Sequence, residues 1–596
     1  MQIINHKNTN LTICQRLFIE KSLELLYLGS IDSYRVRLNN PKSALEELKY
    51  CLEEFDAGRI KHFQTIKSKD KEKKAIIDEV HMLLNYDPNY LVFSSISEKY
   101  LKQLLVTASE NDYKKLISAI DILLDENNSY LASVIVGIEA LITCNNITLA
   151  ELTKIDKSLN ILFSELIHIG FSKGFLYKLT YGIFVNYLTN GKEFNTCFNN
   201  FKSRILLSPS PYEVIFRIDT TPKVYHAIST INNPDLTLSN NINDIQLESH
   251  HRGELITFNS PARARKFIKC TTVATDYLAA LKKARSILSE YLDVINLGLS
   301  DEFLHIHHRT LVIDRRSPEQ AAFQNNVNIL DGKYRAEKTH YAEFTQKLPA
   351  ILNNQQVQYE TKEKIKSAIR YLRLGNHSTE VEHKFINYWI GLEYLFSNYE
   401  SQSTINRIKD HFINAHALAY VKRNAFSFKK AFEQISTHDQ AKIPSYTPAD
   451  FTCLNIQNFY TEISTHLLND YPLLAFRAME LHKWLFEPNK PANAANYIKK
   501  HKENLEMHFT RIYRLRNEII HDAATNTNSE LIASNLRYYL TFILNELIDF
   551  LSKHYIKEVS IEDYFILNEI ELGNIEHNGY PLAQLLEVDC SIGFIF

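Results

Sequence analysis

The chain has 596 residues, which at roughly 150 residues per domain predicts three or four domains. Lysine and arginine number 67 against 69 aspartates and glutamates, so the formal net charge is −2. This balance excludes a protein that binds nucleic acid by bulk charge alone. Only 15 glycines and 15 prolines are present, well below average usage, so turns are sparse and a mainly helical protein is expected.

The cysteines and the apolar segments indicate the cellular compartment of the protein. The seven cysteines are dispersed and form no C-x-x-C pair, which favours a reducing cytosol over a disulfide framework. The first residues, MQIINHKNTNLTICQRL, lack the basic and apolar regions of a signal peptide. The most apolar run, 131–144, has about fourteen residues, whereas a membrane span needs about twenty. We therefore predict a cytoplasmic protein without a membrane segment.

Residues 1–205 show helical periodicity with short breaks. The segment 43–55, SALEELKYCLEEF, begins at a serine and continues with apolar residues at helical spacing. We predict a helical N-terminal region here, and its expected role is regulation, sensing or partner binding.

Residues 206–345 have a different residue pattern, with segments typical of β-strands. Two segments alternate as strands do, and a long amphipathic helix separates them. A polar, Asn-rich segment and a polar linker are expected as loops. In chain order these are a strand at 208–219, a loop at 232–243, a helix at 274–297, a strand at 302–314 and a linker at 315–335. Strand, helix and strand together predict a small α/β module followed by a linker.

Residues 346–557 are again helical in pattern, and 558–596 are expected to form a short β-rich extension because they contain LGNIEHNGYP. The predicted fold class is therefore mainly α, with a helical N-terminal region, a small α/β middle module and a C-terminal helical bundle.

Several common enzyme classes are disfavoured, because the sequence has no Walker A, G-x-G-x-x-G, H-E-x-x-H or G-x-S-x-G pattern. A histidine cluster at His305, His307 and His308 lies on a predicted strand, where the first two would share one face and His308 would point away. No third ligand is evident nearby, so no metal site and no cofactor are predicted.

The strongest feature lies at 504–552. Its first half places apolar residues on one helical face, while the other face carries Arg511, Arg514, Asn517 and His521. Arg516 precedes His521 by five residues, which is about 140° around a straight helix. The two side chains would therefore meet one ligand only if the helix ends or distorts near Ile520, or if a second subunit completes the pocket.

These residue types suit phosphate chemistry. Guanidinium groups bind phosphate oxygens in a bidentate manner, and imidazole transfers protons near neutral pH. The alternative is a polar helix face whose histidine and asparagine make capping bonds. Spacing alone leaves both interpretations open.

The string RNEIIH, 516–521, resembles the Arg-x4-6-His signature of the HEPN superfamily, and the longer RIYRLRNEIIH is similar to the HEPN domains of ApeA-like anti-phage proteins. HKFINYWIGLEYLFS, 383–397, is similar to an earlier helix of those domains, where an aromatic residue, a small residue and a glutamate recur. The resemblance covers about a third of the chain. It implies a four- or five-helix up-and-down bundle within 346–557, with an insertion. The helical pattern of 1–205 departs from the β-rich front of many ApeA-like proteins.

This resemblance implies a metal-independent endoribonuclease that acts as a homodimer or higher homo-oligomer. By position, Arg516 would stabilise transition-state charge, His521 would act as general acid or base, and Asn517 would orient the phosphate or the imidazole. Glu393 would either position Arg516 or only satisfy backbone groups. Arg511 and Arg514 would be supporting residues.

The implied substrate is RNA, with tRNA among the candidates, because the reaction uses the 2′-hydroxyl. The implied role is anti-phage defence by abortive infection, switched on by an unknown phage-derived trigger. The alternative is a non-catalytic HEPN protein that binds RNA or a nucleotide, or that scaffolds a larger complex.

Overall fold

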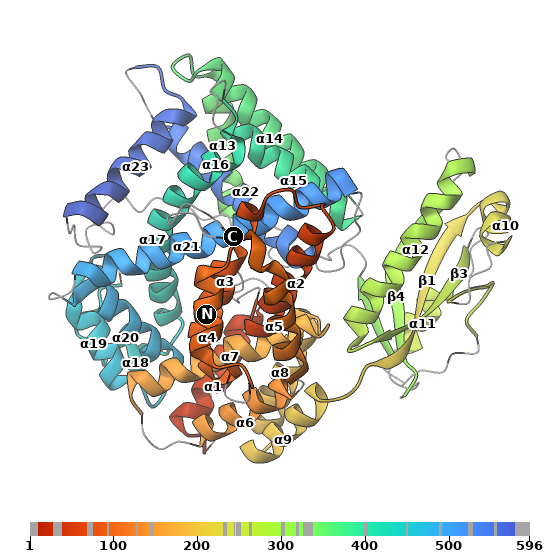
Figure 1. Ribbon diagram of the computed structural model, residues 1–596, viewed down its shortest axis with the longest axis horizontal. Coiled ribbons are helices and arrows are strands. Elements are labelled where there is room, and N and C mark those ends of the chain that lie inside the picture. The colour runs from red at the N-terminus through yellow and green to blue at the C-terminus, as the bar shows by residue number, and fades with distance from the viewer. Residues whose placement is uncertain are drawn as a thin grey trace. The chain divides into compact units, whose positions relative to one another are not determined.

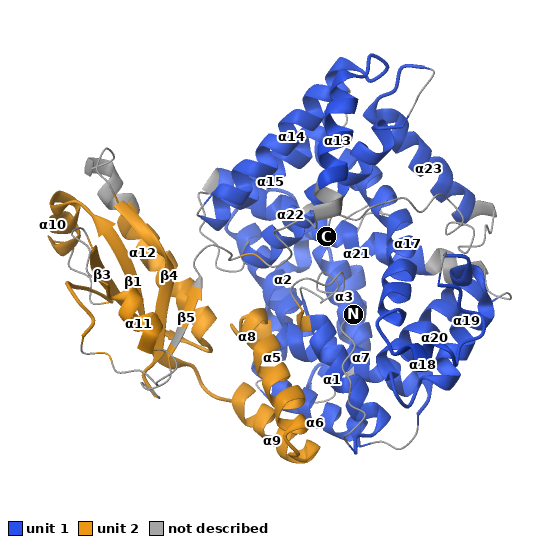
Figure 2. Cartoon of the chain, turned by 180° about the vertical axis from the view of Figure 1, so that it is seen from behind, with its two compact units in different colours: residues 1–25, 29–165, 332–596 blue, residues 26–28, 166–331 orange. Residues whose placement is uncertain are grey.

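A computed structural model gives the architecture (Figure 1). It describes residues 10–27, 39–67, 75–91, 94–126, 129–143, 147–230, 235–243, 245, 252–260, 265–299, 304–316, 321–325, 330, 338–378, 380–398, 403–448, 451–487, 491–522, 529–553 and 557–578. The chain forms two compact units, and Figure 2 distinguishes them by colour. Unit 1 comprises residues 1–25, 29–165 and 332–596, and unit 2 comprises 26–28 and 166–331. The protein is mainly helical, as predicted, with one small antiparallel sheet.

Unit 1 is helical in both of its sequence segments. The N-terminal segment contains α1 (Ile13–Leu26), α2 (Pro41–Asp56), η2 (Phe63–Thr65), α3 (Ile76–Tyr86), η3 (Pro88–Leu91), α4 (Glu98–Thr107), η4 (Glu110–Asp112), α5 (Tyr113–Glu126), α6 (Tyr130–Ile142) and most of α7 (Leu149–His168). The C-terminal segment contains α13 (Lys338–Asn353), α14 (Tyr359–His377), α15 (Val381–Phe396), α16 (Thr404–Arg407), η7 (Ile408–Phe412), α17 (Ile413–Phe432), α18 (Thr437–Gln440), η8 (Thr452–Asn455), α19 (Gln457–His466), α20 (Pro472–Phe486), α21 (Pro491–Asp522), α22 (Ser529–Leu551) and α23 (Ile561–Asn578).

Helix α2 shows how the local sequence sets an element of this unit. The Asn40 side chain accepts a hydrogen bond from the Ser43 backbone N–H, and the Ser43 hydroxyl accepts one from the Asn40 backbone N–H. Pro41 occupies the first turn, where its missing N–H is not needed. The helix therefore begins at Pro41, two residues before the predicted start, and buries Leu45, Leu48 and Leu52 in the N-terminal core.

The two helical segments of unit 1 are joined by polar contacts between α1 and α20. The buried Glu20 carboxyl group, whose pKa is raised to about 8 by burial, accepts a hydrogen bond from the Leu473 N–H at 3.0 Å. Glu24, also buried, pairs with Arg477 at 2.8 Å. Since buried carboxyl groups require such partners, these contacts hold α1 against the start of α20.

Unit 2 contains the end of α7, α8 (Lys173–Tyr181), η5 (Gly182–Tyr187), α9 (Phe194–Ile205) and the sheet with its helices. The sheet order is β2-β3-β1-β4-β5, and every pairing is antiparallel. Its elements are β1 (Ser210–Thr220), α10 (Pro222–Thr230), β2 (Leu236–Ser239), α11 (Arg252–Phe258), β3 (Arg265–Ala274), α12 (Tyr277–Leu299), β4 (Leu304–Asp314) and β5 (Ala321–Asn325). Helices α10 and α12 cover one face of the sheet, whereas Phe258 of α11 packs on the other.

The predicted strands at 208–219 and 302–314 and the helix at 274–297 are confirmed as β1, β4 and α12. The predicted loop at 232–243 contains the short strand β2, and the linker at 315–335 contains β5, so both predictions are wrong over those residues. Both are edge strands that pair with longer neighbours. Such pairing is a long-range interaction, so a short local sequence does not predict it. Helices α8 and α9 belong to unit 2 with the sheet, whereas α1–α6 belong to unit 1 with the C-terminal helices.

The prediction of a β-rich extension at 558–596 is wrong, because α23 occupies Ile561–Asn578. Ile561, Phe565, Leu572 and Ile575 are buried, and this apolar face stabilises a helix although Gly573 lies within it. A single bridge between Val357 and Val559 precedes the helix. Residues 579–596 lie outside the described part of the chain.

No helix among the described residues combines the length and apolar content needed to cross a bilayer. The apolar run at 131–144 contributes most of α6, whose Ile135, Ile138 and Ile142 are buried while Val136 is 64% exposed.

Helices α14 and α15 pack very closely. A Cβ atom at Gly375 would lie 2.4 Å from the ring of Tyr388, whose side chain is fully buried. The Tyr388 hydroxyl also donates a hydrogen bond to Asn376 Oδ1 at 3.0 Å, which limits movement of the ring. Glycine at 375 is thus required by the space between the helices rather than by its backbone conformation.

We therefore predict that Gly375→Ala lowers the free energy of unfolding by about 1–3 kcal/mol through overpacking. Thermal and denaturant unfolding would measure the change. Gly573→Ala is the matched control, because nothing lies within 4 Å of a Cβ at that helical glycine. The control should be neutral or stabilising by up to about 1 kcal/mol. Equal effects of the two substitutions would contradict the packing argument.

Candidate active site

Helix α21 carries the whole Arg-His motif. It runs for 32 residues, from Pro491 to Asp522, so it neither ends at Ile520 nor stops before His521. The angular separation of about 140° between Arg516 and His521 is therefore retained. His521 belongs to the last turn of α21, but its side chain lies outside the described residues.

Arg516 and Asn517 are brought together. Arg516 Nη1 donates a hydrogen bond to Asn517 Oδ1 at 3.1 Å. Arg516 is half-buried, and its buried Nε has no hydrogen-bond partner among the residues that the structure describes. A buried guanidinium N–H without a partner is unfavourable, so this donor is suited to an oxyanion ligand.

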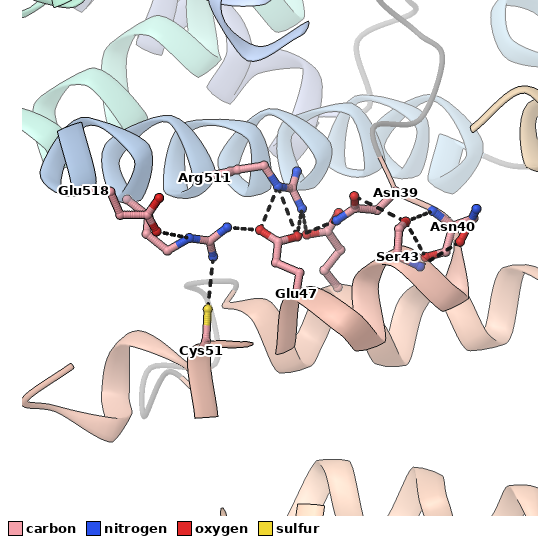
Figure 3. Close-up of polar contacts among 9 residues, drawn as sticks. Asn39, Asn40, Ser43, Glu47, Cys51, Arg511 and Glu518 are labelled. Carbon is pink, nitrogen blue, oxygen red and sulfur yellow. Dashed lines mark hydrogen bonds and ion pairs between the residues drawn. The ribbon is translucent and has the colours of Figure 1, made fainter. Parts of the chain in front are cut away.

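Arg511 and Arg514 lie elsewhere on the helix and are held by carboxylates. Arg511 is 7% exposed and pairs with Glu47 of α2 at 2.9 Å and with Glu79 of α3 at 2.6 Å. Arg514 pairs with the same Glu47 and, at 3.5 Å, with Glu518. Figure 3 shows Arg511 and Glu518 projecting from α21 toward Glu47 and Cys51 of α2.

The electrostatics of this cluster, formed by Arg511, Arg514, Glu47, Glu79 and Glu518, follow from its burial. Burial lowers the pKa of Arg514, and the Glu518 carboxylate opposes that shift. Burial and the charge of Glu518 raise the pKa of the Cys51 thiol to about 12, so Cys51 is neutral; its Sγ lies 3.6 Å from Arg514 Nη1. Carboxylates of α2 and α3 thus neutralise Arg511 and Arg514, and these two arginines do not form one cationic patch with Arg516.

Glu393, on α15, accepts a hydrogen bond from Trp389 Nε1 at 3.0 Å. The Trp389 ring lies beside Tyr513 of α21, with centroids 6.0 Å apart. Among the described residues no ion pair joins Glu393 to Arg516. The helix at 383–397 is confirmed as α15, with Phe385, Trp389, Leu392 and Phe396 buried.

A second polar cluster was not predicted from the sequence. His416 of α17 contacts His501 of α21, Nδ1 to Nε2, at 3.0 Å, and contacts the Tyr538 hydroxyl of α22 at 3.3 Å. Arg423 donates to the same hydroxyl. The available signal was spacing, because His416 and Arg423, like His501 and His508, are seven residues apart and share a helix face.

The histidines of β4 do not alternate as predicted. The pairing with β1 shifts between Phe216 and Ile218, which indicates a bulge in β4. The ring centroids of His307 and His308 lie 4.3 Å apart, so the prediction that His308 points away is wrong. Within the described part of the chain, no three histidine, cysteine, aspartate or glutamate side chains are grouped as metal ligands.

Comparison with known proteins adds no assignment: no protein-family model, curated protein or solved structure matches this chain.

The cluster around Glu47 yields a prediction about stability. Glu47→Gln removes the carboxylate shared by Arg511 and Arg514, and leaving two partly buried cations undercompensated should lower the free energy of unfolding by about 2–4 kcal/mol. Denaturant unfolding would measure this loss. In the control, Glu363→Gln, the exposed pair with Lys366 at 2.7 Å is broken, and the expected change is below about 0.5 kcal/mol. Similar losses in both variants would overturn the prediction.

His508 yields a prediction about pH. Burial, followed by the charge of Arg511, lowers the pKa of His508 to about 3, and its Nδ1 lies 2.7 Å from the Tyr539 hydroxyl. The unfolded chain binds a proton below about pH 6.5 while the folded chain does not, so stability falls as the pH drops from 6.5 toward 3.

His508→Gln should therefore lose less stability than the wild type between pH 7 and 5, by on the order of 1–2 kcal/mol. Denaturant unfolding at several pH values would measure the difference. His466→Gln, which alters an exposed histidine of α19, serves as the control and should follow the wild-type profile. A His508→Gln profile parallel to that of the wild type would refute the assignment.

Proposed function

We propose that this protein is a metal-independent endoribonuclease of the HEPN type that cleaves RNA, with tRNA among its candidate substrates. The observation that carries the proposal is the arrangement at the end of α21. There Asn517 orients the guanidinium of Arg516, whose buried Nε has no partner among the described residues. The sequence places His521 one helical turn after Asn517.

The chemistry proposed for these residues is transesterification of RNA. The 2′-oxygen attacks the adjacent phosphorus, the bond from phosphorus to the 5′-oxygen breaks, and a 2′,3′-cyclic phosphate forms. Arg516 stabilises the negative charge on the phosphorane-like transition state. His521 takes the proton from the 2′-hydroxyl or gives one to the leaving 5′-oxygen, and Asn517 holds Arg516 in place.

The unbroken course of α21 supports a site that two subunits complete. Arg516 and His521 of one straight helix lie about 140° apart, so one phosphate contacts both only with difficulty. A two-fold axis beside the helix end places His521 of one subunit opposite Arg516 of the other. We therefore propose a homodimer as the active species.

The contacts of the N-terminal helices support a regulatory role for them. Glu47 and Glu79 bind Arg511 and Arg514, which lie five and two residues before Arg516 on α21, so a movement of α2 or α3 would remove the carboxylates that hold the helix carrying the motif. A nuclease acting in its own cell requires restraint. We propose anti-phage defence by abortive infection as the biological role, with a phage-derived trigger acting through the N-terminal region.

We predict that Arg516→Ala and His521→Ala each lower the rate of RNA cleavage at least about 100-fold without loss of folding or dimerisation. Total RNA from expressing cells, with and without phage, and purified RNA with EDTA would be analysed for fragments and their ends. Arg370→Ala, at an exposed arginine of α14, is the control and should cleave as the wild type does.

Undiminished cleavage in both variants would reject Arg516 and His521 as catalytic residues. Intact RNA with the wild type, even under infection, together with altered RNA binding or assembly in the variants, would instead favour a non-catalytic binding or scaffolding protein.

A further inference from the structure

A cleft of about 460 Å³ lies within unit 1, between its two helical segments. Residues of α1, α3 and α7 form one wall, and residues of α17, α20, α21 and α22 form the other. Its volume is that of a small-molecule site. None of the residues Arg516, Asn517 and Glu393 lines it, so it is separate from the proposed nuclease site.

Aromatic rings form much of the C-terminal wall. Trp484 stacks on Tyr497 with ring centroids 3.8 Å apart, and Tyr420 stacks on His501 at 3.7 Å. Tyr420 and Tyr497 are themselves 5.5 Å apart, so the four rings form a continuous series. On the opposite wall Tyr86 lies in the cleft as well. Such flat, partly exposed rings favour a ligand that contains a planar ring system.

The polar lining is cationic in balance. Five lysines and arginines line the cleft against three carboxylates. Each carboxylate is already paired: Asp156 with Lys21 at 3.0 Å, Glu480 with Arg477 at 3.1 Å, and Glu79 with Arg511. Lys157, Lys483 and Lys500 also line the cleft; they are exposed and come from three different helices, and Lys157 Nζ lies 5.2 Å from the centroid of the Tyr86 ring. An anionic ligand is therefore favoured.

The buried end of the cleft is closed by a hydrogen-bonded cluster. His416 and Tyr538 are only 5% and 6% exposed, yet both line the cleft. They are held by the chain of contacts from His501 through His416 to the Tyr538 hydroxyl, which Arg423 also contacts. These contacts engage both ring nitrogens of His416 and the Tyr538 hydroxyl, so the buried end of the cleft is a fixed polar wall that limits how deeply a ring can enter.

We propose that this cleft binds a nucleoside phosphate. The base would lie against the series of Tyr420, Tyr497 and Trp484. The phosphates would bind Lys157, Lys483 and Lys500 at the exposed rim. This binding site does not depend on the proposed ribonuclease activity, and its test uses no cleavage assay.

Tryptophan fluorescence of the full-length protein tests the proposal directly. The chain has two tryptophans, and Trp389 is only 1% exposed, so acrylamide quenches chiefly Trp484. Titration with ATP, GTP, CTP or UTP should give saturable binding of at least one nucleotide at about 1–100 µM and should protect Trp484 from acrylamide. Adenosine, which has the base and ribose only, and pyrophosphate, which has phosphates only, should each bind at least tenfold more weakly than ATP.

Lys500→Glu should weaken the binding at least tenfold. Lys499→Glu is the matched control, because Lys499 is the neighbouring exposed residue of α21 and does not line the cleft; it should bind as the wild type does. Lys483→Glu on α20 provides a second test if the first variant fails to fold, as judged by circular dichroism.

Three outcomes would overturn the proposal. One is the absence of saturable binding for all four nucleotides up to about 1 mM. Another is equal weakening by Lys499→Glu and Lys500→Glu, which would indicate only a diffuse surface charge. The third is binding of RNA oligomers alone, which would indicate a polymer surface.

Discussion

The contact between α2 and α21 in unit 1 depends on one carboxylate. Glu47 of α2 accepts hydrogen bonds from both Arg511 and Arg514 of α21, and Asn39 donates to it at 2.6 Å (Figure 3). Two guanidinium groups this close would repel each other without an anion between them. Glu47 therefore holds α2 against α21, the longest described helix of the C-terminal segment. The cleft lies between the same two helical segments.

Helix α21 links the features described above. Its N-terminal half lines the cleft with Tyr497, Lys500 and His501, its middle carries the arginines bound by Glu47, and its last turns carry Arg516 and Asn517. A helix rises 1.5 Å per residue, so the 15 residues from His501 to Arg516 correspond to about 22 Å. The cleft and the motif thus lie on one continuous helix.

Much of the fold was predictable because its signals are local. The apolar stripe of α15, the capping residues of α2 and the β-forming residues of β1 are each local to one element, so short-range interactions decide them. Strands β2 and β5 were missed because their stability comes from pairing. Helix α23 was misread because Gly573 and nearby asparagines suggested turns, although a buried apolar face outweighs them. The candidate site divides in the same way: Arg516 and Asn517 are neighbours in sequence, whereas the partners of Arg511 and Arg514 come from α2 and α3.

The separation between these partners has a consequence for synthesis. Glu47 and Arg511 are 464 residues apart, and residues 166–331 of unit 2 are made between them. At 5–20 residues per second, α2 leaves the ribosome roughly 20–90 s before α21 is complete. During that interval the apolar faces of the N-terminal helices have no C-terminal partner, while unit 2, almost continuous in sequence, already has all its strands. Unit 1 therefore closes last, and a nascent chain cannot complete α21 before α2 and α3 exist to receive its arginines.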